Sequence, residues 1–195
     1  KRKSGTVLVV GLGNRGVTPD SLGPRVAERV FVTRHIKEHM PEAFDFDIPS
    51  VCAIAPGVLG VTGVETMDIV FGVANKVKPD LIIAVDALAS RRAARISTTI
   101  QLSDSGISPG SGVGNTRADL SRANLGVPVI AVGVPLVVYA STISQDTISL
   151  IADETGLHGD EERLRELAEQ VIAKHMGYFN YTPKDLDLIF EDMAG

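Results

Sequence analysis

The chain contains 195 residues, of which 44% are hydrophobic and 22% are charged, and its formal net charge is −5. These values are ordinary for a globular domain and exclude global disorder. The acidic balance argues against a nucleic-acid-binding protein, which needs a basic face. No apolar run approaches the roughly 20 residues that span a bilayer, and the single cysteine, Cys52, fits a reducing compartment. We therefore expect a soluble cytoplasmic protein with neither nucleic acid nor membrane as a partner.

The first half of the chain predicts two strands that are each followed by a helix. The β-branched run 6–10 is typical of a buried strand, and a glycine ends it. The segment 18–20, Thr-Pro-Asp, suits the N-cap, the first position and the first turn of a helix that reaches about Met40. A second strand is expected at 48–54 and a second helix at 65–77.

The second half contains the strand that the sequence predicts most clearly, the apolar run 81–85. Two further strands are expected at 98–102 and 127–132, separated by a loop, 103–114, that is rich in Gly, Ser and Pro. Three more helices are expected, at 136–151, 160–175 and 182–193.

This alternation of strands and helices predicts an α/β fold with a doubly wound, mostly parallel sheet and helices on both faces. No internal repeat and no change of composition marks a second domain. We therefore expect residues 1–195 to form a single catalytic α/β domain.

A glycine motif follows the first strand. The segment 11–16, Gly-Leu-Gly-Asn-Arg-Gly, matches the G-x-G-x-x-G pattern of dinucleotide-binding proteins. In those proteins the helix begins at the second glycine, so that its N-terminus meets the pyrophosphate. Here the helix is expected to begin only at Thr18 and Pro19. A tight glycine turn is the favoured interpretation, and a nucleotide-binding or regulatory module on this turn is the alternative.

Two aspartates form the sharpest candidate site. Asp86 directly follows the strand 81–85, and Asp20 lies on the turn that leads from the first strand into its helix. In an open α/β sheet both positions face the crevice at the carboxyl ends of the strands. Two close carboxylates cannot both ionise cheaply, so one keeps a proton while the other can activate water. Helix capping remains the structural alternative for both residues.

The glycine-rich loop is a candidate substrate-binding segment, because its backbone N–H groups could bind a substrate backbone or an oxyanion. We expect Asn14 to help to position the substrate. The loop residues expected to do the same are Gly110, Ser111, Gly112 and Gly114.

Other candidates are weaker. His35 and His39 have the i, i+4 spacing of metal ligands on a helix, but the H-E-x-x-H order and a third ligand are missing. Ser90 lacks the G-x-S-x-G turn of a serine hydrolase. We therefore expect no cofactor, with a metal-assisted enzyme using Asp20, Asp86 and a third ligand as the alternative.

Many blocks, in order along most of the chain, resemble the spore germination protease family. The two blocks that matter most are Val-Thr-Pro-Asp at 17–20 and Asp-Ala-Leu-Ala-Ser-Arg at 86–91. The other resembling blocks lie at 11–14, 21–24, 56–60, 62–66, 78–85, 97–100, 104–106, 109–115, 127–135 and 182–187.

This resemblance implies an aspartic-type endopeptidase that degrades small acid-soluble spore proteins in the spore core during germination. It implies that Asp20 and Asp86 are the catalytic pair, that the enzyme is stored as a self-processing zymogen, and that it works as a homotetramer. It also implies a fold similar to that of the hydrogenase maturation proteases, which use a metal at a similar place. The family's N-terminal portion and propeptide are expected to be absent from this chain and its C-terminus to be truncated.

Three residues at two places depart from the family pattern. Arg15 and Gly16 stand where the family usually has an aromatic residue and an asparagine, and Ser108 replaces a frequent histidine. The first departure is expected to alter the mouth of the site.

Overall fold

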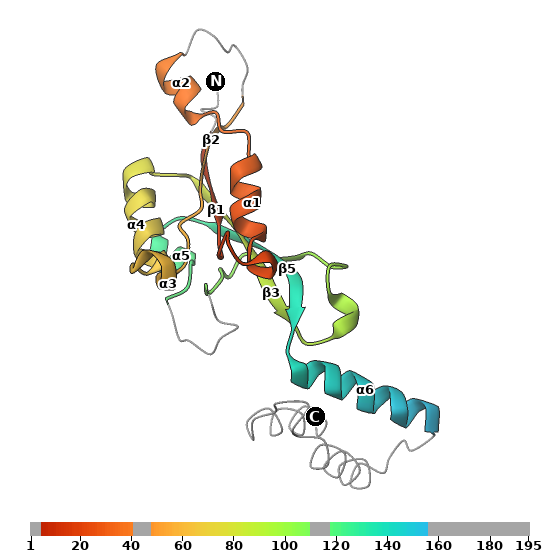
Figure 1. The fold of residues 1–195 in the computed structure, drawn as a ribbon. Helices are drawn as coiled ribbons and strands as arrows, with labels where there is room; N and C mark the ends of the chain where they lie inside the picture. Colours follow the sequence, from red (N-terminus) through yellow and green to blue (C-terminus); the bar gives the residue numbers. More distant parts are fainter. Residues whose placement is uncertain (1–4, 41–47, 110–117, 156–195) are drawn as a thin grey trace. The chain divides into compact units, whose positions relative to one another are not determined.

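The computed structural model describes residues 5–40, 48–109 and 118–155 (Figure 1). The chain forms two compact units. The first comprises Lys1–Leu88 and Ser97–Leu136, and the second comprises Ala89–Ile96 and Val137–Gly195. Asp20 and Asp86 both belong to the first unit, while the expectation of a single domain stays a prediction. In the part of the chain that is described, no helix is both long and apolar enough to cross a membrane.

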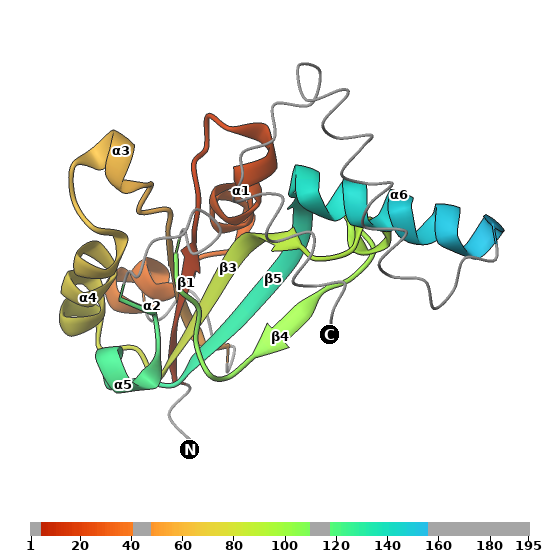
Figure 2. The ribbon, with the colours of Figure 1, turned by 90° about the horizontal axis from the view of Figure 1, so that it is seen from below.

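A five-stranded sheet is the frame of the fold, with the strand order β2-β1-β3-β5-β4 (Figure 2). Strand β1 is parallel to both of its neighbours, β2 and β3, and the edge strand β4 is antiparallel to β5. The strands are β1 (Thr6–Gly11), β2 (Ser50–Ile54), β3 (Leu81–Ser90), β4 (Gln101–Ser103) and β5 (Val129–Val138).

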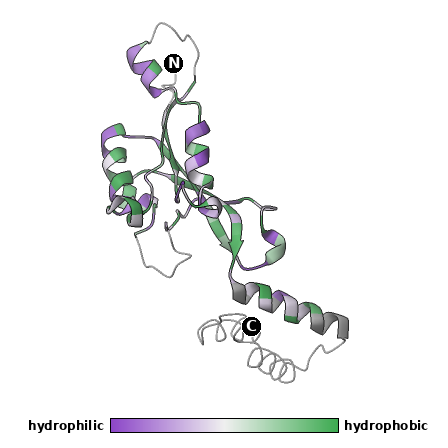
Figure 3. Ribbon diagram, viewed as in Figure 1, coloured by the Kyte–Doolittle hydropathy of each residue, from purple (hydrophilic) through white to green (hydrophobic). Residues whose placement is uncertain are grey.

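Helices separate and follow these strands along the chain. The described helices are η1 (Thr18–Asp20), α1 (Leu22–Arg29), α2 (Arg34–His39), α3 (Leu59–Thr62), α4 (Thr66–Val77), η3 (Ala93–Arg95), α5 (Arg122–Leu125) and α6 (Ala140–Thr155). The strands are mostly apolar, whereas helix α2 is mostly polar (Figure 3). The predicted α/β fold is confirmed.

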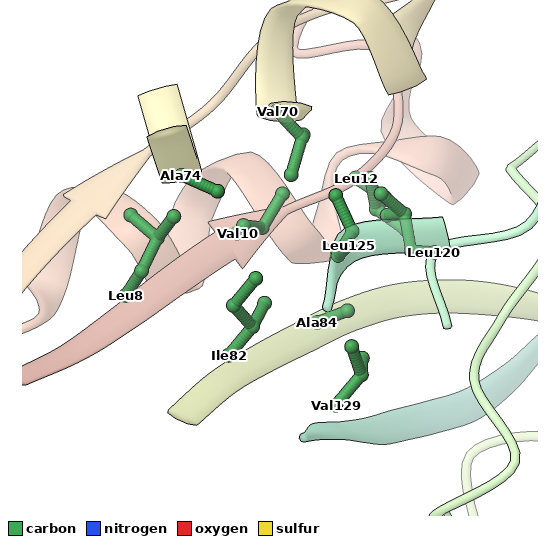
Figure 4. Packing of buried hydrophobic residues seen from close by; sticks show 10 residues of the cluster. All are labelled: Leu8, Val10, Leu12, Val70, Ala74, Ile82, Ala84, Leu120, Leu125 and Val129. Carbon is green, nitrogen blue, oxygen red and sulfur yellow. The ribbon is translucent and has the colours of Figure 1, made fainter. Parts of the chain in front are cut away.

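Helices cover both faces of the sheet. A Cβ atom on Gly11 would lie 2.9 Å from the Cβ of Ala27, so this side of β1 faces α1. Successive strand residues point to opposite faces, and Val10 accordingly belongs to the core cluster that includes Val70 and Ala74 of α4 (Figure 4). The other members of that cluster are Leu8, Leu12, Ile82, Ala84, Leu120, Leu125 and Val129.

The predicted helix from residue 18 to about residue 40 is wrong, because the chain breaks it into η1, α1 and α2. The break follows Val30, and its cause lies in a distant strand. The N–H of Thr33 donates to the Val51 carbonyl at 2.9 Å, and the Thr33 hydroxyl bonds both to the Pro49 carbonyl and to the N–H of Val51. These bonds hold Thr33 beside β2, which an uninterrupted helix would not allow.

Three strands differ in extent from the prediction. β3 continues to Ser90 instead of ending at Val85, and β5 continues to Val138, so α6 begins only at Ala140. β4 is limited to Gln101–Ser103. The predicted strand 48–54 and helix 65–77 are found at Ser50–Ile54 and Thr66–Val77. The predicted helices at 160–175 and 182–193 lie outside the described residues.

In the second unit, the turn after β3 is bound to α6. The N–H of Ala93 donates to Asp146 Oδ2 at 2.9 Å, and the hydroxyl of Ser90 donates to the Arg92 carbonyl at 2.6 Å. Ser90 therefore has a structural hydrogen bond.

Helix α1 approaches the sheet as closely as backbones can. A Cβ atom on Gly23 would lie 2.2 Å from the Leu12 carbonyl oxygen and 2.4 Å from the Val85 carbonyl oxygen. A Cβ on Gly11 would lie 2.0 Å from the Gly23 carbonyl oxygen. Only glycine fits at either position, so the place of α1 against the ends of β1 and β3 is set by backbone atoms.

We expect Gly23→Ala to destabilise the fold by about 3 kcal/mol or more, since the added methyl group meets backbone that cannot move aside. Gly72→Ala is the matched control, because Gly72 also lies in a helix but a Cβ there has nothing within 4 Å. That variant should gain about 0.5–1 kcal/mol from the lower entropy of its unfolded chain. Urea unfolding measures both changes, and equal stability of the two variants would contradict the proposed contact.

Candidate active site

Asp86 lies at the point where β3 passes the end of its neighbour. Gly11, the last residue of β1, pairs with Val85, so Asp86 is the first residue of β3 beyond the end of β1. The expectation that Asp86 follows a strand is therefore corrected, because it lies inside the 10-residue strand β3. Its register nevertheless places it just beyond the carboxyl end of the neighbouring strand β1.

The carboxyl group of Asp86 is buried, and the residue is only 7% exposed. Burial raises the pKa of Asp86 from 3.8 to about 7, because a charge in a low-dielectric environment loses its hydration. A hydrogen bond from the N–H of Ala87 to Asp86 Oδ1, 2.8 Å long, opposes this rise in pKa, while the negative charge of Asp20 adds to it. Asp86 is therefore about half protonated near pH 7 and mostly protonated below it.

Asp20 ends the short helix η1 and is half-buried. Its Oδ2 accepts a hydrogen bond of 2.7 Å from the N–H of Asn14. The prediction that Asp20 is the first-turn acid of a long helix is corrected, since α1 begins after it at Leu22. The Asp20 carboxylate instead points back at the turn that follows β1, where a backbone donor stabilises its negative charge.

The same short turn contacts Asp20 and the residue that precedes Asp86. The N–H of Leu12 donates to the Val85 carbonyl at 2.8 Å, next to Asp86 in the sequence. A Cβ atom on Gly13 would lie 2.8 Å from Asp20 Oδ1, and Gly13 has a φ of +109°, which favours glycine. The turn thus packs against β3 at one end and against the Asp20 carboxylate at the other.

Asn14 holds the turn together with three hydrogen bonds. Besides the bond from its N–H to Asp20, its carbonyl accepts the N–H of Val17 at 3.1 Å. Its side-chain Oδ1 accepts the N–H of Gly16 at 2.9 Å. The side chain expected to bind substrate therefore has a local partner in the turn.

This geometry disfavours nucleotide binding on the G-x-G-x-x-G turn. The N–H groups of Leu12, Asn14 and Gly16 donate to acceptors within the protein, so they are not aligned toward a phosphate. α1 begins at Leu22, well after the last glycine of the motif, and the Asp20 carboxylate stands where an anion would approach.

Comparison with known proteins identifies the relatives of this chain. The family model described as germination protease matches residues 1–173. The chain belongs to the germination protease family. Curated germination proteases from Clostridium tetani and Caldanaerobacter subterraneus are 46% and 50% identical to it, over 97% and 99% of this chain. The chain spans 62% and 64% of the length of these two relatives.

Two further proteins are similar to this chain. A germination protease from Bacillus cereus is 42% identical over 98% of this chain and 64% of its own length. Among solved structures, a NiFe hydrogenase maturation protease from Thermococcus kodakarensis is 21% identical, with 69% of this chain and 76% of that chain covered and a TM-score of 0.44.

The remaining predicted site residues of this germination protease chain divide into two groups. Gly110, Ser111, Gly112 and Gly114 lie outside the described residues, so their expected contact with substrate stays a prediction. His35 and His39 lie exposed on α2. Within residues 5–40, 48–109 and 118–155, no group of three His, Cys, Asp or Glu side chains is close enough to hold a metal ion.

The sequence did not reveal two contacts that shape the site. One is the hydrogen bond from the N–H of Ala87 to Asp86, which depends on the local path of β3. The other joins Arg15 to Glu28 of α1, where Arg15 Nε donates to Glu28 Oε1 at 2.6 Å. Arg15 and Glu28 are 13 residues apart in the sequence, so no helical i, i+4 spacing could have indicated the pair.

The raised pKa of Asp86 predicts how stability depends on pH. Between about pH 4 and 7 the folded protein holds a proton that the unfolded chain releases, so Asp86 makes the wild type less stable as pH rises through this window. Asp86→Asn removes this titration but keeps an oxygen that can accept from Ala87. Relative to wild type, we expect the variant to gain on the order of 2–4 kcal/mol between pH 4 and 8.

The measurement is urea unfolding of both proteins at pH 4, 6 and 8. Titrations shared by the two proteins cancel in the difference between their free energies of unfolding. A difference that stays constant over this range would mean that Asp86 ionises in the folded protein as it does in the unfolded chain.

Proposed function

We propose that this chain is the catalytic domain of an aspartic-type endopeptidase that hydrolyses small acid-soluble spore proteins during germination. Membership of the germination protease family supports a peptidase role. The observation that carries the mechanism is a buried acid, Asp86, within electrostatic reach of a second carboxylate, Asp20. Such a pair can share the work of activating water and polarising a carbonyl group.

The two aspartates take different roles because their surroundings differ. Asp86 is buried, and its pKa of about 7 leaves about half of it protonated at neutral pH and most of it protonated below, so the protonated form donates to the carbonyl oxygen of the scissile bond. Asp20 is more exposed, and its Oδ2 accepts the N–H of Asn14, which holds the carboxylate in place. Asp20 is therefore the base that takes a proton from the attacking water.

The proton transfers balance over the reaction. Water loses a proton to Asp20 as its oxygen bonds to the carbonyl carbon, and Asp86 gives its proton to the carbonyl oxygen. The resulting tetrahedral diol collapses when Asp20 gives its proton to the departing amine nitrogen. A hydroxyl proton of the diol returns to Asp86, which restores the starting state of both carboxyl groups.

The remaining parts of the proposal follow the family resemblance. The enzyme acts in the cytoplasm of the spore core, is made as a zymogen, and assembles as a homotetramer. Backbone N–H groups of Gly110, Ser111, Gly112 and Gly114 bind the substrate chain, while Asn14 acts by holding Asp20.

We expect Asp20→Asn and Asp86→Asn each to lower kcat by about 10²- to 10⁴-fold, because an amide can neither accept nor donate the required proton. Cleavage of a purified small acid-soluble spore protein by the intact enzyme measures this. Asp68→Asn, which changes an exposed acid in the first turn of α4, is the matched control and should keep wild-type activity. Near-normal cleavage by either site variant would remove that aspartate from the mechanism.

A chelator distinguishes this mechanism from the metal-assisted alternative. We expect activity to survive prolonged dialysis against EDTA, since Asp20 and Asp86 suffice for the proton transfers. A loss of activity that zinc or another divalent cation restores would favour the alternative. Metal analysis of the dialysed protein shows whether removal was complete.

A further inference from the structure

The tip of the catalytic turn, defined as Arg15, Gly16 and Val17, is exposed. Val17 is 45% exposed, so apolar packing does little to fix the tip. Its backbone is tied to Asn14, whose own N–H binds the Asp20 carboxylate. A displacement of the tip therefore moves the donor that orients Asp20.

One side-chain contact connects this tip to a rigid part of the fold. Arg15 Nε donates to Glu28 Oε1 at 2.6 Å, and the two side chains are 54% and 50% exposed. Glu28 follows Ala27, which packs against Gly11 of β1. α1 cannot shift toward the sheet, because Gly23 already meets the backbone of Leu12. Glu28 therefore offers the tip a fixed point of attachment.

We propose that the Arg15–Glu28 ion pair is a positioning element of the active site, which holds Asn14 so that its N–H orients the Asp20 carboxylate. The inference rests on the proposed function, because it assigns Arg15 and Glu28 a part in the same reaction. Exposed ion pairs are weak, so the pair adjusts the position of the turn and is not required for folding.

The intact enzyme with Arg15→Gln or Glu28→Gln should show a kcat lowered by about twofold to fivefold, the range that an exposed ion pair supports. KM should stay unchanged, because neither side chain is proposed to contact substrate. The double variant should be no slower than the single variants, since either change alone already breaks the pair. Exchanging the charges, with Arg15→Glu and Glu28→Arg together, should restore much of the lost kcat.

A second exposed ion pair provides a matched control. Arg34 Nη2 lies 2.6 Å from Glu38 Oε1 on α2, with side chains that are 33% and 47% exposed. Arg34→Gln and Glu38→Gln remove a pair of the same kind outside the catalytic turn and should leave kcat unchanged. Thermal unfolding of all variants checks that each is folded under the assay conditions.

The proposal is overturned if Arg15→Gln and Glu28→Gln behave like the α2 controls, if their effects on kcat add in the double variant, or if KM rises while kcat stays constant. An assay of Asp20→Asn under the same conditions distinguishes a failure of the proposed function from a failure of the positioning role. Full activity of Asp20→Asn would contradict the proposed function, in which Asp20 is the base. Loss of activity in Asp20→Asn with wild-type kcat in Arg15→Gln would sink the positioning role alone.

Discussion

The close packing of α1 on the ends of β1 and β3 is the constraint on which the site depends. Gly11 and Gly23 meet without side chains, and Gly23 also contacts the backbone of Val85. Because η1 directly precedes α1, this packing fixes where Asp20 can lie. The neighbouring position on β3 is Asp86. Contacts between backbone atoms thus bring two carboxyl groups from distant parts of the sequence within electrostatic reach of each other.

The value of this arrangement lies in the difference between the two surroundings. If both carboxyl groups were exposed, both would be charged near neutral pH and neither could donate a proton. Burial within β3 makes the charged form of Asp86 costly. Asp20, by contrast, keeps a backbone donor and partial access to solvent. The fold thus gives two residues of the same type different surroundings.

Much of this could be predicted from local patterns. Strand β1, the start of β3 and helix α4 follow from apolar periodicity, and the convergence of Asp20 and Asp86 follows from where parallel strands end. The failures have non-local causes. Thr33 leaves the helix because it bonds to β2, and β3 extends through Ala-Leu-Ala-Ser, which has little strand propensity, beside its neighbour β5. The burial of Asp86 and the local bonds of Asn14 likewise depend on packing that periodicity does not encode.

The glycine contact also bears on how such an enzyme can diversify. Main-chain atoms set the distance between α1 and the sheet, so side-chain substitutions cannot adjust it. No other residue can replace Gly11 or Gly23 without moving the backbone. The exposed residues at the end of the turn have no such restriction, and here an arginine occupies one of them. Substitutions are therefore excluded at the two buried glycines and tolerated at the exposed end of the turn.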